Sequence, residues 1–337
     1  MARSSALIVL LVLLAACGST TTVREPAVTV SGGEPAGGRT GAPAGESDLR
    51  IAVVTHGQAS SPFWAIVRTG VGAAERQMGV QVDYEAPDVY SLERMIDLID
   101  QAVASNPAGL VVSLPEQGLA PAIRRAVEAG VPVVSINSGS DVYRGLGVLS
   151  HVGQPEGRAG YAAGRRLARA GVRRALCVNQ QVGNQGLDAR CAGLARAMRQ
   201  AGGSARVLSV EDEDTAAAPR QIAAGVVEAD ADGILTTNAT SGLQAIDGVA
   251  RARRSDRVKI GAFDLGPDVL EAVRSGELLF AVDQQPYLQG YLPVVMLANR
   301  ARYGLLPSQG DVVATGANFV TRANADQALE LSRRSIR

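Results

Sequence analysis

The sequence is poor in the residues from which metal sites and many active sites are built. It has only 2 His and 3 Cys in 337 residues, and no CxxC pair. A structural zinc site draws Cys and His ligands from closely spaced pairs, so we expect no metal site. No phosphate-binding loop, no G-x-S-x-G elbow and no nucleophile with an acid–base partner can be found. We therefore expect neither an enzyme nor a bound cofactor.

Charge of one sign and long apolar runs are also missing. The 33 basic residues balance 33 acidic ones, and no basic stripe is present, which argues against nucleic-acid binding. No stretch after residue 50 is long and apolar enough to span a bilayer. Aromatic residues make up only 4% of the chain, so the adjacent pair Phe63 and Trp64 stands out.

The beginning of the chain has the composition of an export signal. A weakly basic start precedes an apolar run over residues 6–16, and Cys17 follows directly after two alanines. This run is shorter than the roughly 20 residues that a membrane span needs, and it indicates a secretory signal peptide. Residues 14–17 resemble a bacterial lipobox, in which Cys17 becomes the lipidated first residue. The alternative is an ordinary signal peptide that is cut near Ala16, in which case Cys17 is not lipidated.

Residues 18–48 have the composition of a linker. They are mostly Gly, Ala, Thr, Ser and Pro, with scattered charge and no apolar periodicity. Such a segment cannot bury enough apolar surface to fold, so we expect a flexible tether. A free periplasmic protein would have little use for a flexible tether, so its presence favours a protein that stays attached to the membrane. We therefore expect an extracytoplasmic protein, lipid-anchored to the cell membrane in the periplasm or on the outer face.

From residue 49 onward, apolar runs of strand length alternate with segments of helix length. Continuous apolar strands alternating with helices indicate parallel sheets covered on both faces, and the alternation starts twice, which predicts two α/β lobes. A long helix at about 289–303 is expected to return to the first lobe. Strands are expected at 51–54, 80–84, 109–112 and 131–134, and again at 174–178, 205–208, 233–236, 258–263 and 279–282.

The two remaining cysteines fall in neighbouring elements of the second series. Cys177 lies in a predicted strand and Cys191 in the helix that follows it. In an oxidising compartment two such cysteines can form a disulfide. Two buried thiols are the alternative.

Polar side chains follow nearly every predicted strand. Open α/β sheets bind ligands outside the carboxyl ends of their strands. The loops there are rich in Asn, Gln, Asp and Ser, which both donate and accept hydrogen bonds and suit a neutral polyhydroxylated ligand. Each residue alone is typical of a turn or a cap, and their joint placement indicates a site. His56 also follows a strand but has no evident catalytic partner, so we interpret it as a solvated or capping residue.

Four motifs resemble those of the periplasmic sugar-binding proteins of the ribose-binding type. They are SSPFW at 60–64, GVPVV at 130–134, GAFD at 261–264 and VDQQP at 282–286. The resemblance spans roughly residues 49–321. It implies a type I periplasmic binding protein, in which two Rossmann-like parallel-sheet lobes, joined by a three-strand hinge, close on one sugar. The segments implied are 49–151 with 284–310, 152–283 with 311–325, and a tail at 326–337.

The resemblance also implies roles for individual residues. Ser61 matches a polar contact before the proline, and Phe63 and Trp64 match stacking aromatics. The other implied ligand contacts are Asn137, Gln154, Arg190, Asn238, Asp264 and Gln284.

The chain departs from the family pattern at Asn137 and Ser138. Many members have Asp and Arg there, which offer charge-assisted hydrogen bonds to adjacent hydroxyls, whereas Asn and Ser offer neutral ones. We therefore expect a polyol, inositol or an unusual pentose in place of ribose, glucose or galactose.

The resemblance further implies a monomer that delivers its neutral ligand to an ABC permease. A receptor that reports ligand state to a membrane histidine kinase or chemoreceptor would need the same cleft. The export signal argues against a third possibility, a transcriptional repressor with this core.

Overall fold

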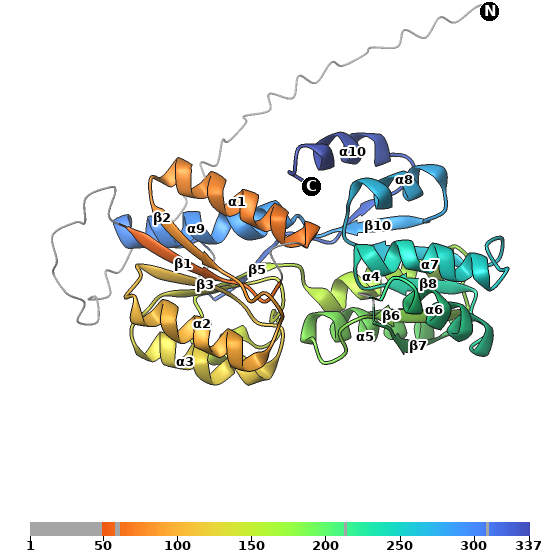
Figure 1. The fold of residues 1–337 in the computed structure, drawn as a ribbon, viewed down its shortest axis with the longest axis horizontal. Coiled ribbons are helices and arrows are strands. Elements are labelled where there is room, and N and C mark those ends of the chain that lie inside the picture. The colour runs from red at the N-terminus through yellow and green to blue at the C-terminus, as the bar shows by residue number, and fades with distance from the viewer. Residues whose placement is uncertain (1–48, 58–60, 212–213, 308–309) are drawn as a thin grey trace, which may run out of the picture. The chain divides into compact units, whose positions relative to one another are not determined.

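The computed structural model describes residues 49–337 except 58–60, 212–213 and 308–309. The predicted signal peptide with Cys17 and the predicted tether at 18–48 lie outside the described residues. All described residues fall within one compact unit, Pro43–Arg337, which contains two six-stranded sheets (Figure 1). This is the two-lobe α/β architecture that the alternating pattern predicts. In the part of the chain that the structure describes, no helix has the length and apolar character needed to cross a bilayer.

The first lobe is built on a fully parallel sheet of order β11-β5-β4-β3-β1-β2. Helices α1 and α9 cover one face, and α2 and α3 cover the other (Figure 1). The elements are β1 (Arg50–Val54), α1 (Pro62–Met78), β2 (Gln81–Glu85), α2 (Leu92–Ala104), β3 (Gly109–Ser113), α3 (Ala120–Glu128), β4 (Val133–Ile136), β5 (Ser150–Gly153), α9 (Pro286–Tyr303) and β11 (Val312–Ala314).

The second lobe repeats this plan with the sheet order β12-β10-β9-β8-β6-β7, in which only β12 is antiparallel to its neighbour. Separate apolar cores lie on the two faces of this sheet, so helices cover it on both sides. The elements are α4 (Glu156–Arg169), β6 (Arg174–Asn179), α5 (Gln185–Gln200), β7 (Ser204–Ser209), α6 (Ala217–Glu228), β8 (Gly233–Thr236), α7 (Ala239–Arg251), β9 (Lys259–Phe263), α8 (Pro267–Ser275), β10 (Phe280–Asp283), β12 (Asn318–Val320) and α10 (Ala325–Arg333).

The structure differs from the predicted segment boundaries at two points. The segment 311–325 was expected in the second lobe, but its strand β11 pairs with β5 in the first sheet, and only β12 joins the second. The expected tail at 326–337 is mostly α10, whose Ala325, Ala328 and Leu329 are part of the core beneath α8. Three-residue strands carry almost no periodicity, and an apolar stripe made largely of alanine is a weak signal.

The chain passes between the described sheets at three places, which form the hinge. They follow β5, follow β10 and separate β11 from β12. Short connections of this kind let two lobes move as bodies while a few backbone torsions change.

Two pairs of helices pack closely against each other at glycines. A Cβ at Gly70 would lie 2.1 Å from the carbonyl oxygen of Tyr287, and one at Gly290 would lie 2.0 Å from that of Val67. Helices α1 and α9 therefore approach each other closely at glycines. Helices α4 and α5 also approach each other closely at a glycine, because a Cβ at Gly160 would lie 2.0 Å from the carbonyl oxygen of Arg190.

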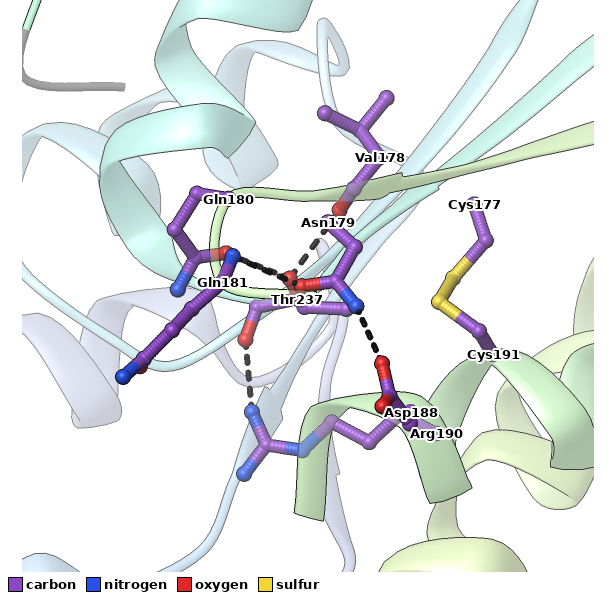
Figure 2. Close-up of a disulfide and its surroundings, with 9 residues drawn as sticks. All are labelled: Cys177, Val178, Asn179, Gln180, Gln181, Asp188, Arg190, Cys191 and Thr237. Carbon is purple, nitrogen blue, oxygen red and sulfur yellow. Dashed lines mark hydrogen bonds between the residues drawn. A yellow bond between two sulfur atoms is a disulfide. The ribbon is translucent and has the colours of Figure 1, made fainter. Parts of the chain in front are cut away.

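Cys177 of β6 and Cys191 of α5 form a disulfide (Figure 2). The bond ties the helix to the sheet at the residue next to Arg190. On the other side of Arg190, Asp188 accepts a hydrogen bond from Asn179 Nδ2 at 2.9 Å. The first turns of α5 are thus fixed to the end of β6, and with them the Arg190 side chain.

Candidate functional site

A cavity of about 610 Å³ lies at the carboxyl ends of strands from both sheets. Its lining comes from segments that follow β1, β2 and β4 in the first lobe and β6, β7, β8, β9 and β10 in the second. This is where open α/β sheets bind ligands. The predicted ligand residues that line it are Ser61, Phe63, Trp64, Asn137, Arg190, Asn238, Asp264 and Gln284.

Gln154 is the predicted ligand residue that the cavity does not include. Its side chain is fully buried in the first hinge segment, and its Nε2 donates to Glu156 Oε2 at 2.8 Å. Glu156 in turn binds Arg190. Gln154 therefore supports the site through Glu156 and Arg190 and does not face the cavity.

Aromatic rings form one wall of the cavity. The Phe63 and Trp64 rings meet edge to face with centroids 5.2 Å apart, and His56 meets Trp64 in the same way at 4.9 Å. The Trp64 indole lies directly against Gly57, where a Cβ would be only 1.6 Å from its Nε1. Edge-to-face contacts and burial hold the rings in place, so they offer a rigid apolar surface to a ligand.

Replacing Trp64 by alanine is expected to weaken ligand binding by roughly 1–3 kcal/mol, because the ring's contact with the ligand is lost. Trp64 is only 7% exposed, so the same change also removes core packing. Calorimetry at a temperature where the variant is folded separates the two effects. Trp64→Phe keeps an aromatic face and should retain most of the affinity; equal losses in both variants would contradict stacking.

Arg190 and Glu156 form a buried ion pair beneath the cavity. The side chains are 3% and 2% exposed. Arg190 Nε donates to Glu156 Oε2 at 2.6 Å, its second terminal nitrogen donates to Oε1 at 2.9 Å, and its first donates to the carbonyl oxygen of Thr237 at 2.6 Å. The guanidinium also lies over the Phe263 ring, 4.3 Å from its centroid. A guanidinium has more N–H donors than these bonds use, so Arg190 can still donate to a ligand.

Asp264 supplies the second charge of the cavity. Gln284 Nε2 donates to Asp264 Oδ1 at 2.6 Å. Burial raises the pKa of Asp264 to about 6, against the lowering effect of Arg190 and of the Gln284 hydrogen bond. At neutral pH the carboxylate is therefore mostly ionised and can accept hydrogen bonds from ligand hydroxyls.

Asn137 and Asp264 occupy equivalent places in the two lobes. Each directly follows its strand, β4 or β9, and each has a left-handed backbone, with φ of 63° and 68°. Few residues other than glycine adopt this conformation, although Asn and Asp do so more readily than most. Strained backbone of this kind concentrates at functional sites, which fits the place of both residues in the cavity wall.

A network of amides connects Asn137 to the hinge. Asn137 Nδ2 donates to Gln284 Oε1 at 3.4 Å and to Gln289 Oε1 at 3.3 Å. Gln289 Nε2 donates to Gln284 Oε1 and to Thr315 Oγ1 at 3.0 and 3.2 Å. Ser138 is buried behind the lining, where its hydroxyl donates to Asn184 Oδ1 at 3.2 Å. These neutral groups are fixed by one another, as a specific polar site requires.

The interpretation of His56 as a solvated or capping residue is wrong. His56 is 8% exposed and lines the cavity, where its backbone nitrogen and its Nδ1 both lie 2.8 Å from Ser113 Oγ. Burial lowers the pKa of His56 to about 3, so the ring is neutral at physiological pH. The only sequence signal for this role is that His56 follows β1.

Several other lining residues are not among the predicted ligand contacts. Tyr90 follows β2, and its hydroxyl donates to Glu116. Further members on the second lobe are Gln180, Gln181, Asn184, Thr215, Thr237 and Thr240. No group of three or more His, Cys, Asp or Glu among the described residues could hold a metal ion.

Ligand affinity is expected to fall as the pH drops through about 6, because protonated Asp264 loses acceptor capacity. At pH 5 the affinity should be about tenfold lower than at pH 8, since the carboxylate fraction falls tenfold per unit below the pKa. Asp264→Asn should bind weakly at every pH and lack this dependence. Calorimetry between pH 5 and pH 8 measures the affinity of both proteins. A wild-type affinity that does not change with pH would contradict the role of Asp264 as a hydrogen-bond acceptor for the ligand.

Acid unfolding must be monitored in the same experiment. The folded pKa of Asp264 is raised, so proton uptake by Asp264 stabilises the folded state as the pH falls. Burial lowers the pKa of His56 to about 3 and of His151 to about 4, so the unfolded state binds more protons than the folded one below about pH 6.5. The histidines therefore destabilise the protein in acid, and thermal melts show where binding data stop being valid.

Comparison with known proteins decides the family. The model of the periplasmic binding protein domain family matches residues 51–304. The chain belongs to this family. The resemblance seen in the four motifs is thereby confirmed.

Individual relatives of this binding protein include sugar-binding proteins. A carbohydrate transporter from Acidothermus cellulolyticus 11B, solved in complex with myo-inositol, is 34% identical, with a TM-score of 0.81 over 86% of this chain and 100% of that one. A xylose/arabinose-binding protein of Sulfolobus acidocaldarius is 23% identical over 84% of this chain and 74% of its own length.

A third relative supports the fold alone. It is an ABC transporter solute-binding protein from Burkholderia graminis C4D1M in complex with D-arabinose, 20% identical, with a TM-score of 0.74 over 83% of this chain and 97% of that one. The relatives are binding and transport proteins, not enzymes, in agreement with the absence of a catalytic motif from the sequence.

Proposed function

We propose that this chain is the solute-binding lipoprotein of an ABC importer, and that it binds a neutral polyol or sugar in the cavity. The observation that carries the proposal is the composition of the lining. Among its described residues, Arg190 and Asp264 are the only charged side chains at neutral pH, and their charges are opposite. The other polar groups are mainly amides and hydroxyls, together with the neutral imidazole of His56, and they suit a ligand with many hydroxyls and no net charge.

A cyclic polyol such as an inositol is the ligand class that the site favours. Asp264 can accept from two adjacent hydroxyls, Arg190 can donate to another, and the wall of Phe63 and Trp64 can cover the apolar C–H face of a ring. Asn137, which lines the cavity, offers a neutral amide where many members of the family have an aspartate. The relative solved with myo-inositol supports the same choice.

Delivery to a permease and anchoring through Cys17 complete the proposal. The three hinge segments allow closure around a ligand, and a permease can recognise the closed form. A lipid on Cys17 with a tether at 18–48 would keep the receptor at high effective concentration near its membrane partner.

A thermal-shift screen of polyols, inositols, pentoses and aldohexoses tests the ligand class. We expect cyclic polyols to raise the melting temperature, whereas stabilisation by common aldohexoses alone would overturn that choice.

Fractionation of cells tests the anchor. The wild type should sediment with membranes and Cys17→Ser should be released, and equal distribution of both would exclude lipidation at Cys17.

A further inference from the structure

Arg337, beyond the last helix, forms an ion pair with a buried aspartate of the hinge. Its Nε and one terminal nitrogen both lie 2.7 Å from Asp283 Oδ2. The Asp283 side chain is fully buried, and that of Arg337 is 27% exposed. Asp283 Oδ1 accepts from the backbone nitrogen of Gln285 at 2.7 Å, so the same carboxylate holds the turn between β10 and α9.

This ion pair lies directly behind the ligand cavity. A second cavity of about 10 Å³ is lined by Arg337 and Asp283 together with Asp264 and Gln284. Asp264 and Gln284 also line the ligand cavity, so they form a wall with the ligand space on one side and Arg337 on the other. A change at Arg337 therefore acts one residue layer away from the ligand.

The ionisation of Asp264 depends first on burial, which raises its pKa, and then on the charges around this wall. Arg190 on α5 favours the ionised carboxylate, while Glu156 on α4 and Asp283 on β10 raise its pKa. His56, across the cavity, is neutral because burial lowers its pKa to about 3. Of these groups, Asp283 is the one whose charge Arg337 compensates directly. Without Arg337, a buried negative charge would remain next to the residue that must itself stay ionised.

We propose that Arg337 is a positioning residue of the ligand site: it pairs with Asp283, fixes the turn that presents Gln284, and compensates the buried charge of Asp283 next to Asp264. The effect on ligand affinity rests on the proposed function, whereas the effect on the Asp264 carboxyl does not.

Titration of the Asp264 carboxyl by carbon-13 NMR in the unliganded full chain tests this directly. In Arg337→Gln we expect the Asp264 midpoint to rise by about one pH unit, because the charge of Asp283 is no longer compensated. In Asp283→Asn the midpoint should fall. In the double variant it should return close to the wild-type value, which is an outcome that lost packing alone does not produce.

Affinity gives a second readout of the same proposal. For myo-inositol, Arg337→Gln should bind several-fold more weakly at pH 6.5 and almost normally at pH 8.5, while Arg337→Lys retains most of the affinity at both. Arg334, which is exposed on the same segment, provides the matched control, and Arg334→Gln should change neither readout.

The outcomes separate the two proposals. An unchanged Asp264 midpoint in both Arg337→Gln and Asp283→Asn, or an affinity loss of equal size at all pH values, would overturn the role of Arg337. If Arg337→Gln does not fold, the Asp283→Asn and Arg337→Lys titrations still test the role of Arg337. A wild type that fails to bind myo-inositol, together with the predicted midpoint shifts, would reject the ligand and retain the positioning role.

Discussion

Asp264→Ala is expected to abolish ligand binding while leaving the protein folded. The variant loses a carboxylate that the cavity holds between Gln284 and Arg190, and hydrogen bonds to an ionised group are the strong ones. Loss of such a partner in a desolvated site typically costs about 2–5 kcal/mol, so affinity should fall by more than about thirtyfold. Calorimetry with a ligand that stabilises the wild type measures this.

Stability should respond differently to the same change. The raised pKa of Asp264 means that burial disfavours its ionised form, so removing the carboxylate relieves that penalty at neutral pH. We expect the unliganded melting temperature to be unchanged or higher. Asp268, exposed in the first turn of α8, is the matched control, and Asp268→Ala should bind normally. Normal affinity of Asp264→Ala would show that Asp264 does not contact the ligand.

Glu156→Ala is expected to be strongly destabilising. It leaves the Arg190 guanidinium buried, without its carboxylate partner and beneath a cavity. Breaking one side of a buried ion pair costs about 3–5 kcal/mol, which is a large fraction of the stability of an ordinary domain. Urea unfolding of the unliganded protein measures the loss. Asp100→Ala, which breaks the half-exposed pair with Arg125, is the control and should have little effect.

Replacing both partners separates stability from binding. Glu156→Leu with Arg190→Met removes the buried charges together, and apolar replacements of a buried pair are often neutral or stabilising. We expect this double variant to recover most of the stability lost in Glu156→Ala but to bind no ligand, because Arg190 is missing. A Glu156→Ala variant within about 1 kcal/mol of wild type would show that the pair is not the structural element that its burial suggests.

The sequence allows the main architecture to be predicted because its central strands are uninterrupted apolar runs. β3 and β8 are buried at every position, and each was expected within one residue of its observed bounds. β4 lies two residues beyond the expected 131–134, since the apolar run begins before the strand does. β5 and β11 were not expected, because a strand with polar buried residues, such as His151, or one of only three residues has no apolar signature.

Site residues that directly follow a strand could be predicted from the sequence. Residues whose role depends on a partner far away in the chain could not. Asn137, Asp264 and Gln284 directly follow β4, β9 and β10, and all line the cavity. Glu156 gave no signal, because its partner Arg190 is on a different helix and only tertiary packing brings them together. Arg337 was assigned to a tail for the same reason, since its contact with Asp283 joins residues far apart in the chain.

Calorimetric titration of the wild-type protein with myo-inositol, and in parallel with ribose, glucose and galactose, tests the central claim most directly. A neutral cavity with a carboxylate, a guanidinium and an aromatic wall predicts binding of a cyclic polyol with micromolar affinity, about −8 kcal/mol, and little heat from the aldoses. Tight binding of an aldose with no binding of any cyclic polyol would contradict the account.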